Sequence, residues 1–378
     1  MHRPHAGALR ALTLSIVIAL GVASGARAGE LGSNLAQVSS FTTQWAFVDI
    51  FRQASDWIPQ LPGPSGPWDT GVPLALDADG WPLLATGQAA GVVLENNGGL
   101  YPAGLYLCTY DGVGTIEFHL DATITVSQPG SAIVAVTPSS LIHVKIVASS
   151  TVDPVRNIRL YMPSYWNDED TQRFHPLFLE RLQPYGVLRF MDWQRTNNSP
   201  LIDWSERTTP ESSTQAGVKG VAIEHVIALA NATGSDPWIC IPHLANDGFV
   251  TELATLLAAD LDPELQVYVE YSNECWNDFF SQAAYCQAQG TALGLSLDPN
   301  EARVRFYSQR SVEVFSIFES VFGGTDRLVR VLAGQLANPW IATTALAHGN
   351  AATQVDALAV NPYIGHHLGT PPTPIDST

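Results

Sequence analysis

The chain has 378 residues, of which 46% are hydrophobic, 9% aromatic and 14% charged, a composition that excludes a disordered chain and indicates a globular protein with a large core. Its length is sufficient for one α/β barrel of about 250 residues and a second, smaller domain. The formal net charge is −18, and a surface this acidic repels phosphate groups, so no nucleic acid or anionic membrane surface is expected as a partner.

Residues 1–28 have the features of an export signal peptide. Two arginines precede an apolar run over residues 11–22, and the small residues Ala26 and Ala28 occupy the cleavage positions. We therefore expect a mature chain that starts near Gly29 and is secreted or periplasmic. Because the apolar run is short, we expect no membrane insertion after cleavage.

The four cysteines are Cys108, Cys240, Cys275 and Cys286. Oxidising compartments favour disulfides, and a bridge between Cys275 and Cys286 would fix the loop after a predicted strand, but four small buried thiols are an equal alternative. The sequence has no Cys-x-x-Cys, no Cys/His cluster with zinc spacing and no nucleotide-binding motif, so neither a metal nor another cofactor is expected.

The pattern of residues in the first part of the chain changes near residue 59. Residues 31–35 are expected to form the first strand of a barrel, and the apolar spacing over 45–57 predicts a short helix behind it. Residues 59–163 contain Pro/Gly-rich turns and short alternating segments, which are typical of an antiparallel β-sandwich. We therefore expect residues 29–58 to begin the barrel and residues 59–163 to form an inserted sandwich domain.

Helices and strands alternate again over residues 164–378. Strands are expected at 186–193, 237–243, from 267, at 327–335 and at 355–363, with helices at 175–182, 220–231 and 249–259 and a long helix that Asp298 caps. Repeated βα units imply a parallel sheet and favour a (β/α)8 TIM-type barrel. Because six strands are counted, we expect an incomplete barrel, with two further units of roughly 30 residues each beyond Thr378.

The predicted strand that starts at Val267 ends abruptly in polar and aromatic residues. Asn273, Glu274 and Trp276 follow it directly. Because the carboxyl ends of barrel strands share one cleft, we expect these side chains in a common site with the residues that end the neighbouring strands. Those residues are Arg189, His243, Gln335 and Tyr363.

The Asn-Glu pair at 273–274, followed by Trp276 and Asn277, resembles the acid/base strand of the retaining (β/α)8 glycoside hydrolases of clan A. The resemblance implies that Glu274 protonates the glycosidic oxygen and that Asn273 binds the neighbouring sugar hydroxyl. The segments 189–193, 196–198 and 157–159 are similar to exported bacterial proteins of this clan that are often labelled cellulose-binding. A polysaccharide or oligosaccharide is therefore the expected partner.

The same resemblance implies roles for the residues at the other strand ends. Arg189 would keep the nucleophile ionised, since a guanidinium lowers the pKa of a carboxylate. His243 would contact substrate, Tyr363 would orient the nucleophile, and Gln335 would line the same cleft. Trp193, Trp276 and Trp340 could stack on sugar rings, although each tryptophan could instead pack in the core.

Several of these residues have structural alternatives. Arg189 could pair with Asp192 or Glu270, because buried charges are usually tolerated as pairs. His243 could be a hydrogen-bonded core histidine. We expect a structural role for Glu270 itself.

Retaining hydrolysis takes two carboxyl groups about 5 Å apart. In clan A the nucleophile is a Glu on the seventh strand, which we expect beyond Thr378. The leading hypothesis is therefore an exported glycoside hydrolase-like protein that hydrolyses nothing as the 378-residue chain, and whose open strand edges reduce its solubility. The alternatives are a non-catalytic carbohydrate-binding or cell-surface protein and a function carried by the β domain.

Overall fold

The computed structural model describes residues 31–95, 100–166 and 172–361. The predicted signal peptide and Tyr363 lie outside these ranges. Within them, none of the helices combines the length and the apolar character needed to cross a bilayer.

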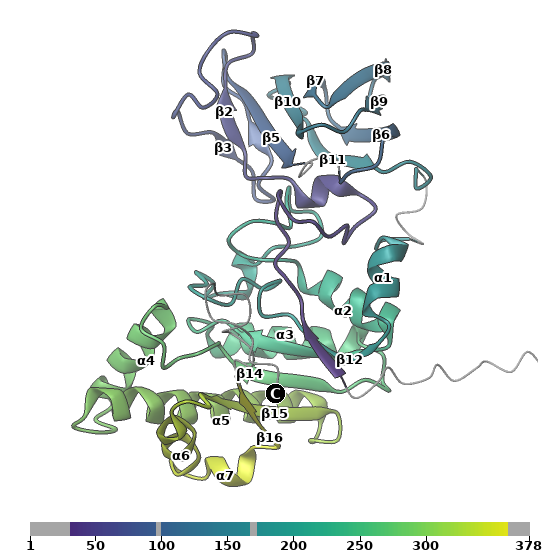
Figure 1. The fold of residues 1–378 in the computed structure, drawn as a ribbon. Helices are drawn as coiled ribbons and strands as arrows, with labels where there is room; N and C mark the ends of the chain where they lie inside the picture. Colours follow the sequence, from purple (N-terminus) through teal and green to yellow (C-terminus); the bar gives the residue numbers. More distant parts are fainter. Residues whose placement is uncertain (1–30, 96–99, 167–171, 362–378) are drawn as a thin grey trace, which may run out of the picture.

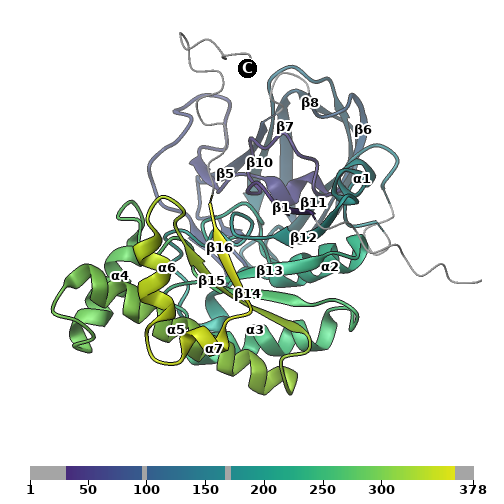
Figure 2. The same cartoon turned by 60° about the horizontal axis from the view of Figure 1, so that its bottom comes forward.

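Six parallel strands form one sheet in the order β1-β12-β13-β14-β15-β16 (Figures 1 and 2). Residues from all six strands line a single pocket, so the sheet is curled, as expected for part of a barrel. The strands are β1 (Leu31–Asn34), β12 (Tyr185–Arg189), β13 (Asp236–Ile241), β14 (Val267–Tyr271), β15 (Leu328–Gly334) and β16 (Ala357–Val360). Among the described residues, β1 and β16 are the edge strands of this sheet, as the sequence predicted.

Helices cover the convex face of the curled sheet (Figure 2). They are α1 (Pro176–Leu182), α2 (Ile223–Thr233), α3 (Asp247–Asp260), α4 (Ser281–Ala292), α5 (Pro299–Phe322), α6 (Pro339–Leu346) and α7 (Ala351–Gln354), with a 3-10 turn η2 (Trp204–Glu206). The core beneath them uses alternate strand residues such as Ile239, Ile241, Val267 and Val269. Because strand side chains alternate between faces, the even-numbered residues of β13 and β14 face the concave side.

The predicted cap of the long helix at Asp298 is confirmed. The Asp298 side chain accepts hydrogen bonds from the backbone N–H groups of Asn300 and Glu301, and Pro299 occupies the first turn of α5. Gly323 ends that helix and Gly234 ends α2, at φ values of 73° and 65° that a residue without Cβ adopts at little cost. Helix α4 was not predicted, since few of its residues are apolar and it lacks a side-chain cap.

The prediction of a helix over residues 45–57 is wrong. This segment contains only a 3-10 turn, η1 (Ile50–Gln53), and all four of its residues are buried. The Asp49 carboxylate accepts hydrogen bonds from the N–H groups of Phe51 and Leu160, which fixes the chain in a tight turn. Its apolar spacing therefore reflects burial on several sides and not one face of an amphipathic helix.

Residues 58–161 form two four-stranded antiparallel sheets, at the top of Figure 1. One has the order β2-β5-β10-β7 and the other β11-β6-β9-β8, and both contribute side chains to one hydrophobic cluster that includes Tyr106 and Val144. The strands are β2 (Ile58–Gln60), β5 (Ala89–Glu95), β6 (Gly104–Asp111), β7 (Gly114–Leu120), β8 (Ala122–Gln128), β9 (Ser131–Val136), β10 (Leu141–Ser149) and β11 (Arg156–Tyr161), beside a two-stranded pair β3 (Ala75–Leu76) and β4 (Pro82–Leu83).

A buried polar network joins η1 to helix α2. Nη1 of Arg52 lies 3.1 Å from Nε2 of His225 and donates to the carbonyl of Pro210 at 3.0 Å. The Asp49 carboxylate lies 3.5 Å from Arg52 and 3.6 Å from Arg159. These contacts compensate charges that would otherwise be costly to bury.

All four cysteines are buried and free. The bridge between Cys275 and Cys286 is not formed. Of the two possibilities that the sequence left open, a disulfide bridge or small buried thiols, the structure contains the buried thiols.

Candidate functional site

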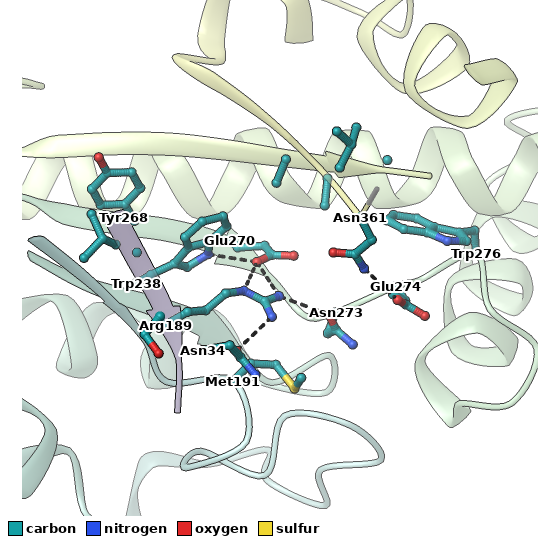
Figure 3. A pocket seen from close by; sticks show the side chains of 17 residues that line it. Asn34, Arg189, Met191, Trp238, Tyr268, Glu270, Asn273, Glu274, Trp276 and Asn361 are labelled. Atoms are coloured by element: carbon teal, nitrogen blue, oxygen red, sulfur yellow. Dashed lines mark hydrogen bonds and ion pairs between the residues drawn. The ribbon is translucent and has the colours of Figure 1, made fainter. Parts of the chain in front are cut away.

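A pocket of about 720 Å³ occupies the concave side of the curled sheet (Figure 3). Its lining is apolar along the strands and polar where the strands end. The apolar lining includes Val187, Trp238, Tyr268, Ala359 and Val360, and the polar lining includes Asn34, Arg189, Glu270, Asn273, Glu274 and Asn361. A pocket of this size with a few convergent polar groups is the usual form of a small-molecule site.

Arg189 and Glu270 form the buried centre of the polar lining. Nε and Nη2 of Arg189 donate to Oε2 of Glu270 at 3.2 and 2.8 Å, and Nε1 of Trp238 donates to the same oxygen at 2.8 Å. The Arg189 guanidinium also lies over the Trp238 ring, 5.2 Å from its centroid. Of the two structural partners considered for Arg189, Asp192 and Glu270, the structure therefore pairs it with Glu270.

The ionisation of this pair follows from its surroundings. Burial acts against the positive charge of Arg189, but the charge of Glu270 and its hydrogen bonds to the guanidinium favour that charge, and the pKa of Arg189 is raised above its ordinary value. Burial raises the pKa of the Cys240 thiol well above its ordinary value, so the neutral thiol donates a hydrogen bond to Oε2 of Glu270 at 3.5 Å. Arg189 and Glu270 thus lie together as a charged pair with several hydrogen bonds.

Asn273 is held from both ends of its side-chain amide. Its Oδ1 accepts from Nη2 of Arg189 at 3.0 Å, and its Nδ2 donates to Oδ1 of Asn197 at 3.0 Å. The Gln282 side chain donates to the Asn273 carbonyl at 2.8 Å. These contacts fix the orientation of the amide, which still has one N–H and one lone pair for a ligand.

Glu274 lies at the rim of the pocket on an unusual backbone. Ser272 and Glu274 have φ values of 59° and 44°, a left-handed conformation that costs free energy for residues with a Cβ. The carboxylate of Glu274 accepts from Nδ2 of Asn277 at 2.8 Å and from Nδ2 of Asn361 at 3.1 Å. Such strain persists where the surrounding structure imposes it, and it is frequent at functional sites.

Trp276 completes the part of the site that β14 provides. It is half-buried, lines the pocket beside Glu274, and packs edge-on against Tyr307 with ring centroids 6.1 Å apart. The structure thus brings four of the predicted residues together, Arg189, Asn273, Glu274 and Trp276, as Figure 3 shows.

His243 and Gln335 do not line this pocket. His243 is buried, and burial lowers its pKa to about 4; its Nε2 lies 3.5 Å from Oγ of Ser281 and its ring packs against Tyr285. Gln335 is half-buried in a tight turn with Asn338 after β15. Its strand contributes Ala333 and Gly334 to the lining instead.

Two of the predicted sugar-stacking tryptophans lie elsewhere. Trp193 is only 1% exposed and packs among Phe47, Phe178 and Phe190, so for this residue the structure contains the alternative of packing in the core. Trp340 is 44% exposed on α6 and is not among the residues that line the pocket.

Asn34, Trp238 and Asn361 are among the lining residues that were not predicted from the sequence. Asn34 ends β1 and Asn361 follows β16, so the rule that selected Arg189 at the end of β12 would also have selected them. Trp238 could have been found from the alternation of β13, which places it opposite Tyr268 in register.

The described residues contain no group of three or more His, Cys, Asp or Glu side chains that could hold a metal ion. No family model, no curated protein and no solved structure matches this chain.

Proposed function

We propose that the pocket of the parallel sheet binds a saccharide chain and that Glu274 acts there as the acid/base of a glycoside hydrolase-type site. One observation carries the proposal: Asn273, Glu274 and Trp276 follow a single parallel strand and line one pocket together with Arg189. A carboxyl group, a fixed amide and an indole ring are the groups that proton transfer to a glycosidic oxygen, hydroxyl binding and ring stacking require.

The contacts of each residue suit its proposed role. The Glu274 carboxyl is half-buried at the rim, where the amides of Asn277 and Asn361 hold it in place. Asn273 is oriented by Arg189 and Asn197 and retains hydrogen-bonding capacity for a sugar hydroxyl. Trp276 offers an indole face whose size and rigidity suit the C–H face of a pyranose ring.

A second candidate function, non-catalytic saccharide binding, is favoured by the state of Glu270. The two carboxylates among the described pocket residues are Glu270 and Glu274. Glu270 is 1% exposed, and its Oε2 accepts hydrogen bonds from Arg189, Trp238 and Cys240, so it is poorly placed to attack a sugar. A retaining reaction would need a second carboxylate about 5 Å from Glu274, and the described pocket lining supplies only Glu270 besides Glu274.

The architecture around the pocket and the predicted export signal agree with this function. The curled sheet is interpreted as part of a (β/α)8 barrel, and the two antiparallel sheets, which lie in the chain between β1 and β12, as an inserted β-sandwich domain. With residues 1–28 interpreted as an export signal, the site would meet a polysaccharide outside the cytoplasm.

The test compares glycosides that differ in their leaving group. In the protein that also supplies the second carboxylate, the Glu274→Gln amide keeps the shape of the side chain but cannot donate the proton, so hydrolysis of an alkyl glycoside should fall at least 100-fold, while an activated aryl glycoside should lose much less. Glu252→Gln, an exposed residue of α3, is the matched control. Equal losses on both glycosides would overturn the acid assignment.

The same experiment separates the two candidate functions. Saccharide binding without hydrolysis of either glycoside by the protein that also supplies the second carboxylate would establish the non-catalytic candidate and reject the hydrolase. Neither binding nor hydrolysis would reject both.

A further inference from the structure

A second pocket lies on the outer face of the antiparallel sheet β2-β5-β10-β7. On β10 the residues Ile142, Val144 and Ile146 belong to the hydrophobic cluster, so His143 and Lys145 point to the opposite face. Both are nevertheless buried, at 6% and 7% exposure. Polar side chains this deeply buried outside the core indicate that another part of the chain covers them.

The covering part is segment 61–68, with the sequence Leu-Pro-Gly-Pro-Ser-Gly-Pro-Trp. Nε2 of Gln60 donates to the Trp68 carbonyl at 3.0 Å, and Nζ of Lys145 donates to the Gly63 carbonyl at 3.1 Å. Two prolines, Pro64 and Pro67, restrict the backbone between the anchored carbonyls of Gly63 and Trp68. The segment and the sheet enclose a pocket of about 350 Å³, which His119 also lines.

Gly91 provides the space for this arrangement. A Cβ atom at residue 91 would lie 2.6 Å from Oε1 of Gln60 and 2.7 Å from Nε2 of His143. Nε2 of His143 lies 3.2 Å from Oε1 of Gln60, and since the Gln60 amide nitrogen donates to Trp68, His143 is the donor in that contact. Burial, followed by the charges of His119 and Lys145, lowers the pKa of His143 to about 4, which keeps it neutral at pH 7.

The charge of this pocket is opposite to that of the protein. The whole chain carries a formal charge of −18, yet its described lining contains Lys145 and two histidines and no Asp or Glu. Glu117 is opposite Lys145 in register, but its carboxylate contacts Nε2 of His119 at 3.2 Å. Among the described residues no carboxylate lies within 4 Å of the Lys145 ammonium, which has two N–H groups left after its bond to Gly63.

An aromatic side chain stands at the rim of the same pocket. Trp68 is 51% exposed, and its ring centroid lies 4.7 Å from that of His143. An exposed indole beside a buried ammonium matches a ligand that has an apolar ring face and a negative group. We propose that this pocket binds a uronic acid unit, with its carboxylate at Lys145 and its pyranose ring against Trp68.

This site uses none of the residues proposed to act at the parallel sheet, so it does not depend on Glu274. Binding is measured by isothermal titration calorimetry with galacturonate and glucuronate oligosaccharides, the neutral galactose and glucose oligosaccharides, and acetate. We expect uronate binding that depends on Lys145 and is weakened by rising salt concentration, whereas any binding of the neutral oligosaccharides at the pocket of the parallel sheet should not depend on Lys145.

Lys145→Gln is the principal variant, because its amide can still donate to the Gly63 carbonyl while the charge is lost. We expect at least a tenfold loss of uronate affinity. The matched control, Lys219→Gln, changes the other lysine, which is exposed, and should leave affinity unchanged. Trp68→Ala should also weaken binding.

Three results would overturn the proposal: no uronate binding by the wild-type protein, binding of neutral sugars that Lys145→Gln weakens as much as it weakens uronate binding, or equal affinity for acetate and uronates. Unchanged affinity in a folded Lys145→Gln protein would do the same. If thermal melting shows that this variant is unfolded, His119→Gln, at an exposed position that lines the pocket, takes its place, and the same tenfold criterion applies.

Discussion

Nη2 of Arg189 lies 2.8 Å from Oε2 of Glu270 and 3.0 Å from Oδ1 of Asn273. One guanidinium thus connects a buried carboxylate on β14 to the amide that precedes Glu274. The pair supports the proposed site in two ways, since it compensates the charge of Glu270 and fixes the direction of the Asn273 side chain.

Removing Arg189 should destabilise the protein. In Arg189→Met, Glu270 would keep its contacts with Trp238 and Cys240 but would lose the positive charge beside it, and breaking such a buried pair costs about 3 kcal/mol or more. Urea unfolding measures this loss. The double variant Arg189→Met/Glu270→Leu should regain much of the stability, and a double variant no more stable than Arg189→Met would contradict the charge-pair explanation.

His225 should make the protein sensitive to mild acid. Burial, followed by the charges of Arg52, Arg173 and Arg159, lowers its pKa in the folded state well below 6.5, so the unfolded state binds more protons as the pH falls. Its contribution to stability is complete above pH 6.5 and is lost below it, by up to about 1.4 kcal/mol per pH unit for one proton.

The measurement is the urea midpoint at pH 7.5 and at pH 5.0. The wild-type protein should lose stability between these values, and His225→Gln should lose less. His119→Gln, at an exposed histidine, is the control and should follow the wild type. An identical loss in the wild type and in His225→Gln would contradict the prediction.

How far the sequence could predict the site depended on the alternation of side chains along each strand. The end of β14 was predicted correctly as the place where Asn273, Glu274 and Trp276 gather, because an apolar run ends there in polar residues. The prediction that His243 shares this pocket failed because His243 is two residues beyond Ile241 in the alternation. It therefore points to the same side as Ile239 and Ile241, whose side chains lie in the core under the helices. Alternation counted from Tyr268 would have placed Glu270 in the pocket.

Other features depended on contacts that lie far apart in the sequence. The 3-10 turn at Ile50–Gln53 is fixed by a hydrogen bond between Asp49 and the Leu160 N–H, more than 100 residues away. The segment over His143 and Lys145 has no periodicity, so only the structure shows that these residues share a pocket with Trp68.

The four thiols should react slowly in the native protein. All are buried, and burial is the main reason that the pKa values of Cys108, Cys240 and Cys275 are raised, so little thiolate is available to a thiol reagent. Four thiols should react after unfolding without reductant. Two reactive thiols under those conditions would instead indicate a bridge between Cys275 and Cys286.

Gly290 should be required where helix α4 crosses α5. A Cβ atom there would overlap the backbone carbonyl of Ala302, and neither helix can shift without disturbing the core. Gly290→Ala should therefore lower the free energy of unfolding by about 2 kcal/mol. Gly217→Ala, where the nearest atom to an added Cβ is 3.7 Å away, is the matched control, and equal stability of the two variants would contradict the prediction.

The central claim is that the pocket beside Glu274 binds saccharide, and calorimetric titration with neutral oligosaccharides such as cellohexaose, xylohexaose and mannohexaose tests it most directly. We predict binding of at least one oligosaccharide by the wild-type protein and at least a tenfold loss in Trp276→Ala and Asn273→Ala. Trp340→Ala, an exposed tryptophan outside the pocket, should bind as the wild type does. Binding that survives Trp276→Ala and Asn273→Ala but is lost in Trp340→Ala, or no binding of any neutral oligosaccharide, would contradict the account.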